Sequence, residues 1–579
     1  MDLHTAEPTQ TSTRPRPLVL AWYCLAAVLA VITYFYALDS DHIPKNGDEY
    51  PYMHITRLTA ASGHLLPLQS ELENMRNTKP PLLFWQGIAS TNWGRNWSLW
   101  HLRYPSVIYT LLTGLMVFLL AVRLARSLET GFLALLVFLA FFSTYRYGRP
   151  FLTNPPEVFW LFMPFFVLLY GQPRSFESRF AVPLLLGASV GIGLLYKSFA
   201  LLMPVGLALT WWYWRQRGYR LGTFLVRDSW KLALVGCLAL AVFSLWFILD
   251  PNPKAIWREF VLGENMKKFD PGGPSYLSQL LWGDSSIWRL VLGYPLDAGL
   301  LAVPLVALFF ISIQRHGEMS DAEKLLWIWV ITLFVVFSLP SQRDERYLLA
   351  GMPALAVLCA LSWHRIDRKF FLVTLIAAGA VVVLLAYLSL RLEYGITGVR
   401  VYSPGYWVLL GIAGVVIVLG LFRLRLTTPL LNVAVLLVYL IFAAFTRPLD
   451  LNLGQYSRET QEYARGKDVW VPTNFRAKEE AHRFFLPGVK LHAYTRDPSL
   501  TVSALGARFP LFAITVPILS PDVTPAEGKV IGQRLDIGGR HNSSQIKAMV
   551  LGKVYENLFI KELLIEAPVP AHDFHTFPE

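Results

Sequence analysis

The sequence predicts a polytopic α-helical membrane protein with about thirteen transmembrane helices, followed by a small α/β domain. Of the 579 residues, 54% are hydrophobic and only 16% are charged, whereas soluble globular domains average about 25% charged residues. Apolar runs fill residues 1–446, and most of them are long enough to cross a hydrocarbon layer about 30 Å thick. These observations exclude a wholly soluble enzyme.

Thirteen apolar runs can be separated by the charged and turn-forming residues between them. They cover residues 17–38, 104–122, 131–142, 158–170, 181–196, 199–214, 232–249, 298–313, 325–339, 347–363, 370–390, 406–422 and 430–445. A full crossing needs roughly 20 helical residues, so several runs are short, above all the third and fourth.

The charge pattern predicts the orientation. The net charge is +12, and the cations fall mainly between the apolar runs, which indicates membrane orientation rather than nucleic-acid binding. With a cytoplasmic N-terminus, the inner connections carry clusters such as Arg123 with Arg126, and Arg365 with Arg368 and Lys369. The first long loop, residues 39–103, then lies on the outer face.

Residues 447–579 change in character. They contain no membrane-length run, and short apolar or alternating stretches at 468–472, 509–516 and 528–532 predict strands. Helical patterns at 460–465 and 479–485 lie between them. We therefore expect a small α/β domain on the same outer face as the loop 39–103.

Asp48 and Glu49 open a dense group of ionisable residues in the first outer loop, which also contains Arg57. On a helix, adjacent side chains differ in direction by about 100°, so one carboxylate can face a substrate while the other packs or binds a cation. This pair suits a general base or a metal ligand near a phosphate. The alternative is solvated loop charge. The helix should stop near Gly63.

Lys79 precedes two prolines, which exclude ordinary helix at this point and hold the ammonium group in a defined place. It could bind a lipid phosphate or simply anchor the next apolar segment at the interface. Other cations occur at predicted outer ends of the spans, against the orientation rule, and a multiply charged phosphate ligand would explain them. These outer polar groups include Arg149 with Glu157, Lys197 in a tight turn, and Arg346 beside Tyr347.

The sequence lacks the motifs that are typical of several other enzyme classes. The sequence has no phosphate-binding Walker loop, dinucleotide-binding glycine turn or nucleophile elbow. Three cysteines lie in apolar runs and read as small hydrophobic residues. The histidines of the first outer loop have no zinc-signature spacing.

Several motifs together resemble a known family. The segments Gly47–Glu49, Ala61–Gly63 and Lys79–Trp85, with later stretches ending at Lys197 and around Arg346, resemble the bacterial aminoarabinose lipid A transferases and the related protein O-mannosyltransferases. The resemblance implies a C-type glycosyltransferase fold. Such enzymes take a sugar from a polyprenyl phosphate on the outer membrane face and invert its anomeric centre.

The resemblance also implies roles for individual residues. Asp48 would be the carboxylate of the catalytic centre, with Glu49 beside it, while Lys79 and Lys197 would hold the donor phosphate. Arg346 and Tyr347 would line the same cavity.

This chain departs from the family pattern in three places. Tyr50-Pro-Tyr52 stands where relatives often have Pro-Arg-Tyr, so Arg57 is a candidate replacement for the arginine. Thr78 replaces an acidic residue before the lysine. Asn154 replaces another, with Glu157 as a candidate substitute. Whether these residues bind a divalent metal is therefore left open by the sequence.

The expected function is transfer of a sugar, 4-amino-4-deoxy-L-arabinose or a similar one, from undecaprenyl phosphate to lipid A or another envelope glycan. The protein would be a multi-pass protein of the bacterial inner membrane, with its active site and residues 447–579 in the periplasm. Three alternatives stay open: an enzyme with a protein hydroxyl as acceptor, a carrier or flippase for lipid-linked sugars, and a binding subunit without activity. A carrier is expected to show internal repeats with broken helices at mid-membrane, and no clear repeat is present.

Overall fold

The structure is a computed structural model. It describes residues 17–43, 47–73, 75–266, 276–396, 400–474, 476–495, 497, 500–538 and 541–568.

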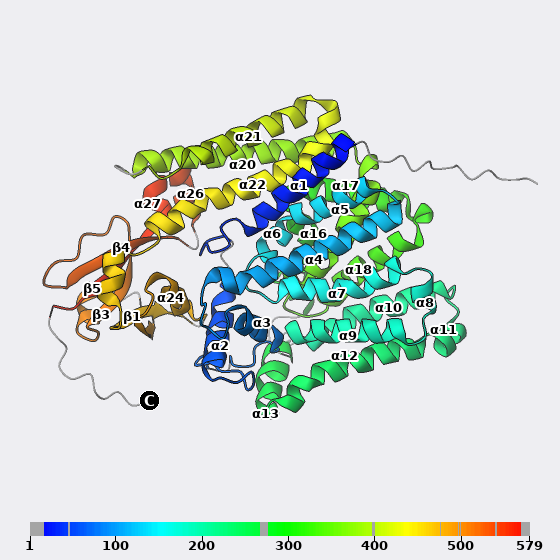
Figure 1. The fold of residues 1–579 in the computed structure, drawn as a ribbon, viewed down its shortest axis with the longest axis horizontal. Coiled ribbons are helices and arrows are strands. Elements are labelled where there is room, and N and C mark those ends of the chain that lie inside the picture. Colours follow the sequence, from blue (N-terminus) through cyan, green and yellow to red (C-terminus); the bar gives the residue numbers. More distant parts are fainter. Residues whose placement is uncertain are drawn as a thin grey trace, which may run out of the picture.

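Each of the thirteen apolar runs forms a helix. The helices are α1 (Pro17–Phe35), α4 (Leu99–Ala125), α5 (Leu128–Ala140), α7 (Asn154–Tyr170), α9 (Ala181–Tyr196), α10 (Leu202–Gln216), α12 (Ser229–Leu249), α17 (Ala302–Gln314), α18 (Asp321–Ser338), α19 (Met352–Ser362), α20 (Arg368–Gly395), α21 (Pro404–Phe422) and α22 (Thr427–Pro448). They lie side by side in one bundle, with their long axes roughly aligned (Figure 1).

Length and composition qualify fewer helices as complete membrane crossings than the thirteen predicted. Within the described residues, eight continuous helical stretches, some made of several adjoining helices, are long and apolar enough to cross. A ninth is added if α5 and α6 (Phe142–Gly148), which meet at 65°, form one broken span. The helices α7, α9 and α10 have 17, 16 and 15 residues, or about 23–26 Å at 1.5 Å per residue. The chain is thus a multi-pass membrane protein with eight or nine spans by this measure.

Short helices lie between or next to these helices. They are α2 (Glu49–Ala61), α3 (Leu82–Ser90), α8 (Arg174–Glu177), η1 (Phe199–Leu201), α11 (Leu221–Arg227), α13 (Pro253–Ile256), the π-helical η2 (Trp257–Asn265), α14 (Tyr276–Trp282), α15 (Trp288–Val291), α16 (Gly293–Ala298), η4 (Gly299–Leu301), η5 (His316–Glu318), the 3₁₀ helix η6 (Glu345–Gly351), η7 (Trp363–Arg365), η8 (Leu424–Leu426) and η9 (Leu449–Leu453).

The predicted stop of the first loop helix is confirmed. The helix α2 ends at Ala61, and Gly63 has a φ of +74°, a left-handed conformation that glycine adopts without strain.

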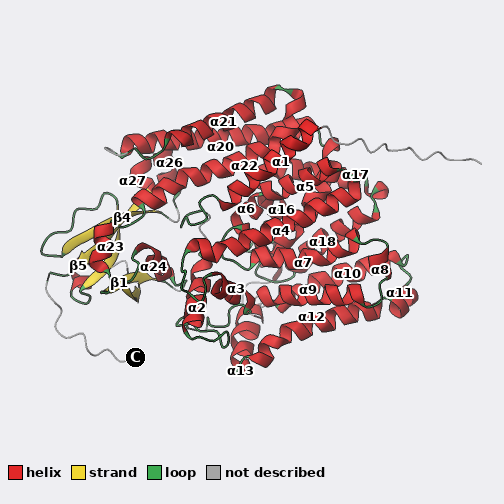
Figure 2. Cartoon of the chain, in the orientation of Figure 1, coloured by secondary structure: helices red, strands yellow, loops and turns green. Residues whose placement is uncertain are grey.

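The C-terminal part is a mixed α/β unit at one end of the bundle (Figure 2). Its five strands are β1 (Asp468–Thr473), β2 (Lys490–Thr495), β3 (Leu511–Pro517), β4 (Lys529–Ile537) and β5 (Phe559–Glu566). Their order is β2-β1-β3-β5-β4, with β1 parallel to β2 and β3, and β5 antiparallel to β3 and β4. Its helices are α23 (Arg458–Ala464), η10 (Lys478–Ala481), α24 (His482–Phe485), α25 (Val502–Gly506), α26 (Ser543–Val550) and α27 (Val554–Leu558).

The three predicted strands and both predicted helical segments of this unit are present, and β2 and β5 are additional. The strand β2 was not predicted because most of its residues are exposed, so its sequence lacks a strong apolar alternation. The strand β5 has consecutive buried residues rather than alternating ones, which is the pattern of a strand covered on both faces.

Glu480 in η10 ties this unit to α2. Its carboxylate accepts hydrogen bonds from Arg57 Nη2 at 2.7 Å and lies 2.9 Å from His54 Nδ1. Burial alone would raise the pKa of Glu480, but the hydrogen bonds from His54 and Arg57 outweigh it and lower the pKa to about 2. The C-terminal unit therefore holds the helix that begins directly after Asp48.

Candidate functional site

A cavity of about 460 Å³ opens at the end of the bundle nearest the C-terminal unit. Segments that are far apart in sequence contribute to its wall: the start of α2, the turn before α3, the start of α7, the turn after α9, the end of η2, and the segment from α18 to η6. Of the predicted site residues, Asp48, Lys79, Lys197, Arg346 and Tyr347 line it. The structure thus brings five of the nine together around one space.

The first ion pair of the cavity joins Asp48 to Arg346, with Nη1 2.7 Å from Oδ2. Asp48 is the residue before α2 but makes no side-chain hydrogen bond to the helix end, so its carboxylate is available to the arginine. Asp344 accepts hydrogen bonds from both the backbone N and Nε of Arg346. The desolvation of Asp344 acts to raise its pKa, but the positive charge and hydrogen bonds of Arg346 prevail and lower it.

The second pair joins Lys79 to Glu264, with Nζ 2.7 Å from Oε1. Lys79 Nζ also donates to the carbonyl oxygen of Thr78 at 3.0 Å. The helix α3 begins at Leu82, after the two prolines, so the prediction that Lys79 lies outside ordinary helix is confirmed. Its side chain is 15% exposed and can reach a ligand in the cavity.

The third pair joins Lys197 to Glu157, with Nζ 2.6 Å from Oε2. Glu157 lies in the first turn of α7, is 2% exposed, and also accepts a hydrogen bond from Asn154 Nδ2 at 3.3 Å. The ammonium group of Lys197 lies 5.7 Å from the ring centroid of Tyr347, over its face. Glu157 therefore holds Lys197 from behind the cavity wall.

Apolar side chains also line the cavity. They include Phe199 and Leu201 of η1, Met203 of α10, and Val336, Phe337 and Leu339 at the end of α18. Met203 and Leu339 are 51% and 50% exposed, so the apolar wall continues to the outer surface of the bundle. A cavity lined by three cations and an apolar wall fits an amphipathic anion.

The chain is similar to known glycosyltransferases. The family model for dolichyl-phosphate-mannose-protein mannosyltransferase matches residues 21–258. Undecaprenyl phosphate-alpha-4-amino-4-deoxy-L-arabinose arabinosyl transferase 1 of Sodalis glossinidius (strain morsitans) is 27% identical over 411 residues, covering 67% of each chain. The corresponding transferase 2 of Pseudomonas fluorescens (strain Pf0-1) is 26% identical over 463 residues, covering 77% of this chain and 72% of that protein.

The fold is also similar to that of a solved enzyme. The crystal structure of ArnT from Cupriavidus metallidurans bound to undecaprenyl phosphate matches with a TM-score of 0.60 at 16% identity, covering 94% of this chain and 98% of that one. The matched family model and these relatives support a polyprenyl-phosphate-sugar-dependent glycosyltransferase. The relatives are named as sugar transferases, which argues against the carrier alternative.

Within this glycosyltransferase, the structure places Glu49 outside the cavity lining. Its carboxylate accepts hydrogen bonds from Nε and Nη2 of Arg103 at 2.9 and 2.7 Å, and from the backbone N of Phe151 at 2.7 Å. Both Glu49 and Arg103 are buried. The expected divergence of the two adjacent carboxylates is therefore found, with Asp48 facing the cavity and Glu49 packed behind it.

Two predicted arginines also lie outside the lining. Arg57 pairs with Glu480 of the C-terminal unit, so it does not take the place of the missing arginine, and Arg346 supplies the cation beside Asp48. Arg149 is fully buried and donates to the carbonyl oxygen of Tyr34 and the hydroxyl of Tyr145. It links α6 to α1.

Glu264 and Asp344 also belong to the site, as a lining residue and as a partner of Arg346, and neither is among the site residues predicted from the sequence. Asp344 could have been found because it lies two residues before Arg346, close enough to form a local ion pair. Glu264 precedes Asn265, which accepts a hydrogen bond from Ser198 at 2.7 Å. Nothing in their spacing indicates that Glu264 meets Lys79, which is 185 positions away.

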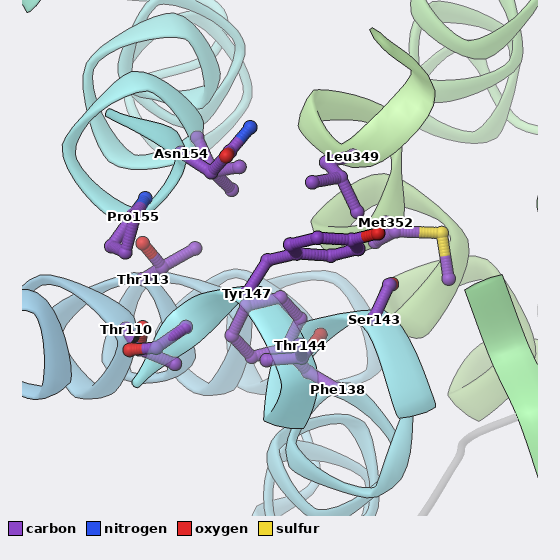
Figure 3. Close-up of a pocket in the computed structure, with 12 residues that line it drawn as sticks. Thr110, Thr113, Phe138, Ser143, Thr144, Tyr147, Asn154, Pro155, Leu349 and Met352 are labelled. Carbon is purple, nitrogen blue, oxygen red and sulfur yellow. Dashed lines mark hydrogen bonds between the residues drawn. The ribbon is translucent and has the colours of Figure 1, made fainter. Parts of the chain in front are cut away.

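A second, small cavity of about 30 Å³ has Asn154 in its wall (Figure 3). Thr110, Ser143 and Tyr147 contribute to its wall. Its volume is that of about one water molecule, so it cannot hold a sugar. Asn154 lines both cavities.

Each described carboxylate at the large cavity is paired with a cation: Asp48 with Arg346, Glu157 with Lys197 and Glu264 with Lys79. A divalent metal bound there would have to displace one of these cations. The site can instead hold a phosphate by exchanging carboxylate partners for phosphate oxygens.

Proposed function

We propose that this glycosyltransferase moves a sugar, 4-amino-4-deoxy-L-arabinose or a similar one, from undecaprenyl phosphate to lipid A or another envelope glycan. The observation that carries the proposal is the cavity that Lys79, Lys197 and Arg346 line together with apolar side chains. The similarity to arabinosyl transferases over about two thirds of the chain supports the choice of donor.

The donor phosphate would lie among the three cations, and its first isoprene units would follow the apolar wall. Lysine ammonium groups bind phosphate as point charges, whereas arginine offers two parallel donors. The exposed Met203 and Leu339 mark where the lipid tail would leave the cavity for the membrane.

In the reaction, the bond between the anomeric carbon and the phosphate oxygen breaks, and its electron pair stays on the phosphate. An acceptor oxygen forms the new bond from the opposite face, so the anomeric centre is inverted. Cations already in place stabilise the charge that develops on the leaving phosphate. Protonation of the leaving group is then unnecessary.

The acceptor determines what Asp48 has to do. A phosphate of lipid A is already an anion and needs no proton removed, so Asp48 would mainly hold Arg346 in position. A protein hydroxyl would need a base, and Asp48 would have to leave Arg346 to accept the proton. The match of residues 21–258 to a protein mannosyltransferase model favours this second acceptor class as the alternative.

We further propose that all thirteen helices cross the membrane, with residues 1–446 forming the transmembrane domain and 447–579 a periplasmic domain. Among the thirteen helices, Asp48 and Lys79 follow the first, Lys197 the fifth and Arg346 the ninth, and the C-terminal domain follows the last. If all thirteen helices cross, each of these segments comes after an odd number of crossings and lies on the same side of the membrane. The shared cavity of Asp48, Lys79, Lys197 and Arg346 supports this count. The same arrangement fits a bacterial inner membrane protein whose donor is presented from the periplasm.

The direct test is transfer by the purified full chain in vesicles that contain undecaprenyl phosphate-aminoarabinose. One set of vesicles contains lipid A, a second a serine- and threonine-rich peptide, and a third no acceptor. The proposal expects the mass of the sugar residue to appear on lipid A. Labelled peptide would instead establish the protein acceptor, and absence of transfer to either would refute the proposed donor and acceptor pair.

A further inference from the structure

A cluster around His42 lies outside the catalytic cavity, where three parts of the chain meet. Asp41 and His42 belong to the first outer loop, Asp450 to η9 at the end of the last span, and Asp536 to β4 of the C-terminal unit. The side chains of His42, Asp450 and Asp536 are 8%, 6% and 6% exposed. Neither the proposed reaction nor the donor site uses any of these residues.

The donor atoms of Asp41, His42 and Asp536 have the spacing of metal ligands. His42 Nε2 lies 3.1 Å from Asp536 Oδ1, and donor atoms from all three side chains lie within 4.8 Å of one another. Two ligand atoms bonded to one tetrahedral zinc ion at 2.0–2.1 Å lie about 3.3 Å apart. The His42 and Asp536 atoms already have this separation, and a small rotation would bring in Asp41.

The surroundings of His42 orient Nε2 toward these carboxylates. Asp450 hydrogen-bonds to Nδ1, and Ser40 Oγ hydrogen-bonds to the second oxygen of Asp450. The backbone N of His42 donates to Ser40 Oγ at 3.2 Å. Histidines that bind metals usually donate their other ring N–H to a carboxylate, which sets the tautomer, and Asp450 stands in that place.

The other ligands are also held by neighbours. Tyr50 donates to Asp41 Oδ1 at 2.9 Å. Lys478 lies 4.0 Å from Asp536 Oδ2, which leaves Oδ1 facing His42. One imidazole nitrogen with two carboxylate oxygens suits a borderline cation such as Zn²⁺ better than Mg²⁺ or Ca²⁺, which prefer all-oxygen ligands.

We propose that Asp41, His42 and Asp536 bind a zinc ion that fastens the C-terminal unit to the first outer loop, with Asp450 orienting the histidine. The zinc ion would lie between His42 Nε2 and the carboxylates of Asp41 and Asp536, whose donor atoms already lie within 4.8 Å of one another.

The test measures zinc on the full chain in detergent, after chelator treatment and desalting. Titration with ZnCl₂ against a chromophoric indicator should give one tight site per chain. His42→Ala and Asp536→Asn should lose it, and Asp450→Asn should bind about 10- to 100-fold more weakly. His64→Ala and Asp39→Asn, which change an exposed histidine and an exposed aspartate of the same loop, should bind as the wild type does.

X-ray absorption at the zinc edge gives a readout that needs no variant to fold. The wild type should show one nitrogen and two carboxylate oxygens at about 2.0–2.2 Å, completed by water. Absence of a tight site, unchanged binding in folded His42→Ala and Asp536→Asn, or a different ligand set would overturn the proposal. Sugar transfer is not part of this test, so its failure leaves the proposed function standing.

Discussion

Asp48 Oδ2 accepts a hydrogen bond of 2.7 Å from Nη1 of Arg346, a residue 298 positions further along the chain. This pair connects the start of α2 to the start of η6 across the cavity. Arg346 is held a second time by Asp344. The carboxylate and the guanidinium therefore depend on each other for their positions, and a change in either should affect the other cations that line the cavity.

Asp48→Asn should lower the rate of sugar transfer by about 100-fold or more, the range found when one positioned group that stabilises developing negative charge is lost, because Arg346 would no longer be held in place. The asparagine keeps the size of the side chain but cannot hold Arg346 as an ion pair. The measurement is kcat for transfer in vesicles, with protein level and membrane insertion checked by blotting. Asp39→Asn, which alters an exposed aspartate that pairs with Arg447, serves as the control. Full activity in Asp48→Asn would remove Asp48 from the mechanism.

Lys79→Ala should raise the KM for the lipid-linked donor by about 10- to 100-fold, because a charged hydrogen bond contributes about 1.5–3 kcal/mol. Lys79→Arg should recover part of the loss, since it keeps the charge. Lys254→Ala removes an exposed lysine outside the cavity lining and should leave KM unchanged. An unaltered KM in Lys79→Ala would mean that this lysine only anchors the segment at the membrane.

Lys197→Ala should destabilise the protein as well as weaken donor binding. It leaves Glu157, which is 2% exposed, without its cation, and breaking a buried pair in this way costs about 3–5 kcal/mol. Thermal unfolding in detergent measures the loss. The double variant Glu157→Gln with Lys197→Met should regain most of the stability but not the donor affinity. Equal unfolding temperatures for Lys197→Ala and the wild type would contradict this account of the pair.

Acid should release the C-terminal unit from α2. The pKa of Glu480 falls from its ordinary 4.5 to about 2 in the folded protein, so its stabilising contribution is complete above about pH 4.5. That contribution is lost as the pH falls from about 4.5 through 2. Hydrogen exchange of α2 amides between pH 5 and 2 should show increasing opening.

Glu480→Gln should already be partly open at pH 5 and should lose most of this pH dependence. Glu459→Gln, a change of an exposed glutamate in α23, should follow the wild-type curve. A wild-type α2 that stays equally protected throughout this range would show that Glu480 does not hold the domain.

Three arginines show why part of the site could not be predicted from the sequence. Arg57, Arg149 and Arg346 all occur in predicted outer segments, yet they pair with Glu480, with main-chain carbonyl groups, and with Asp48, respectively. Their local sequences do not separate these outcomes. The cavity requires segments from separate helices to dock, and a partner such as Glu264 for Lys79 exists only after that docking.

The sequence by itself determined the thirteen helices, three of the five strands, the helix stop at Gly63 and the non-helical position of Lys79, because hydropathy, proline and glycine act on neighbouring residues. Only the tertiary structure decided that Asp48 rather than Glu49 faces the cavity, and that Glu157 holds Lys197 from behind. These outcomes depend on which distant surfaces pack together, and buried charges take whichever partners that packing brings within hydrogen-bond distance.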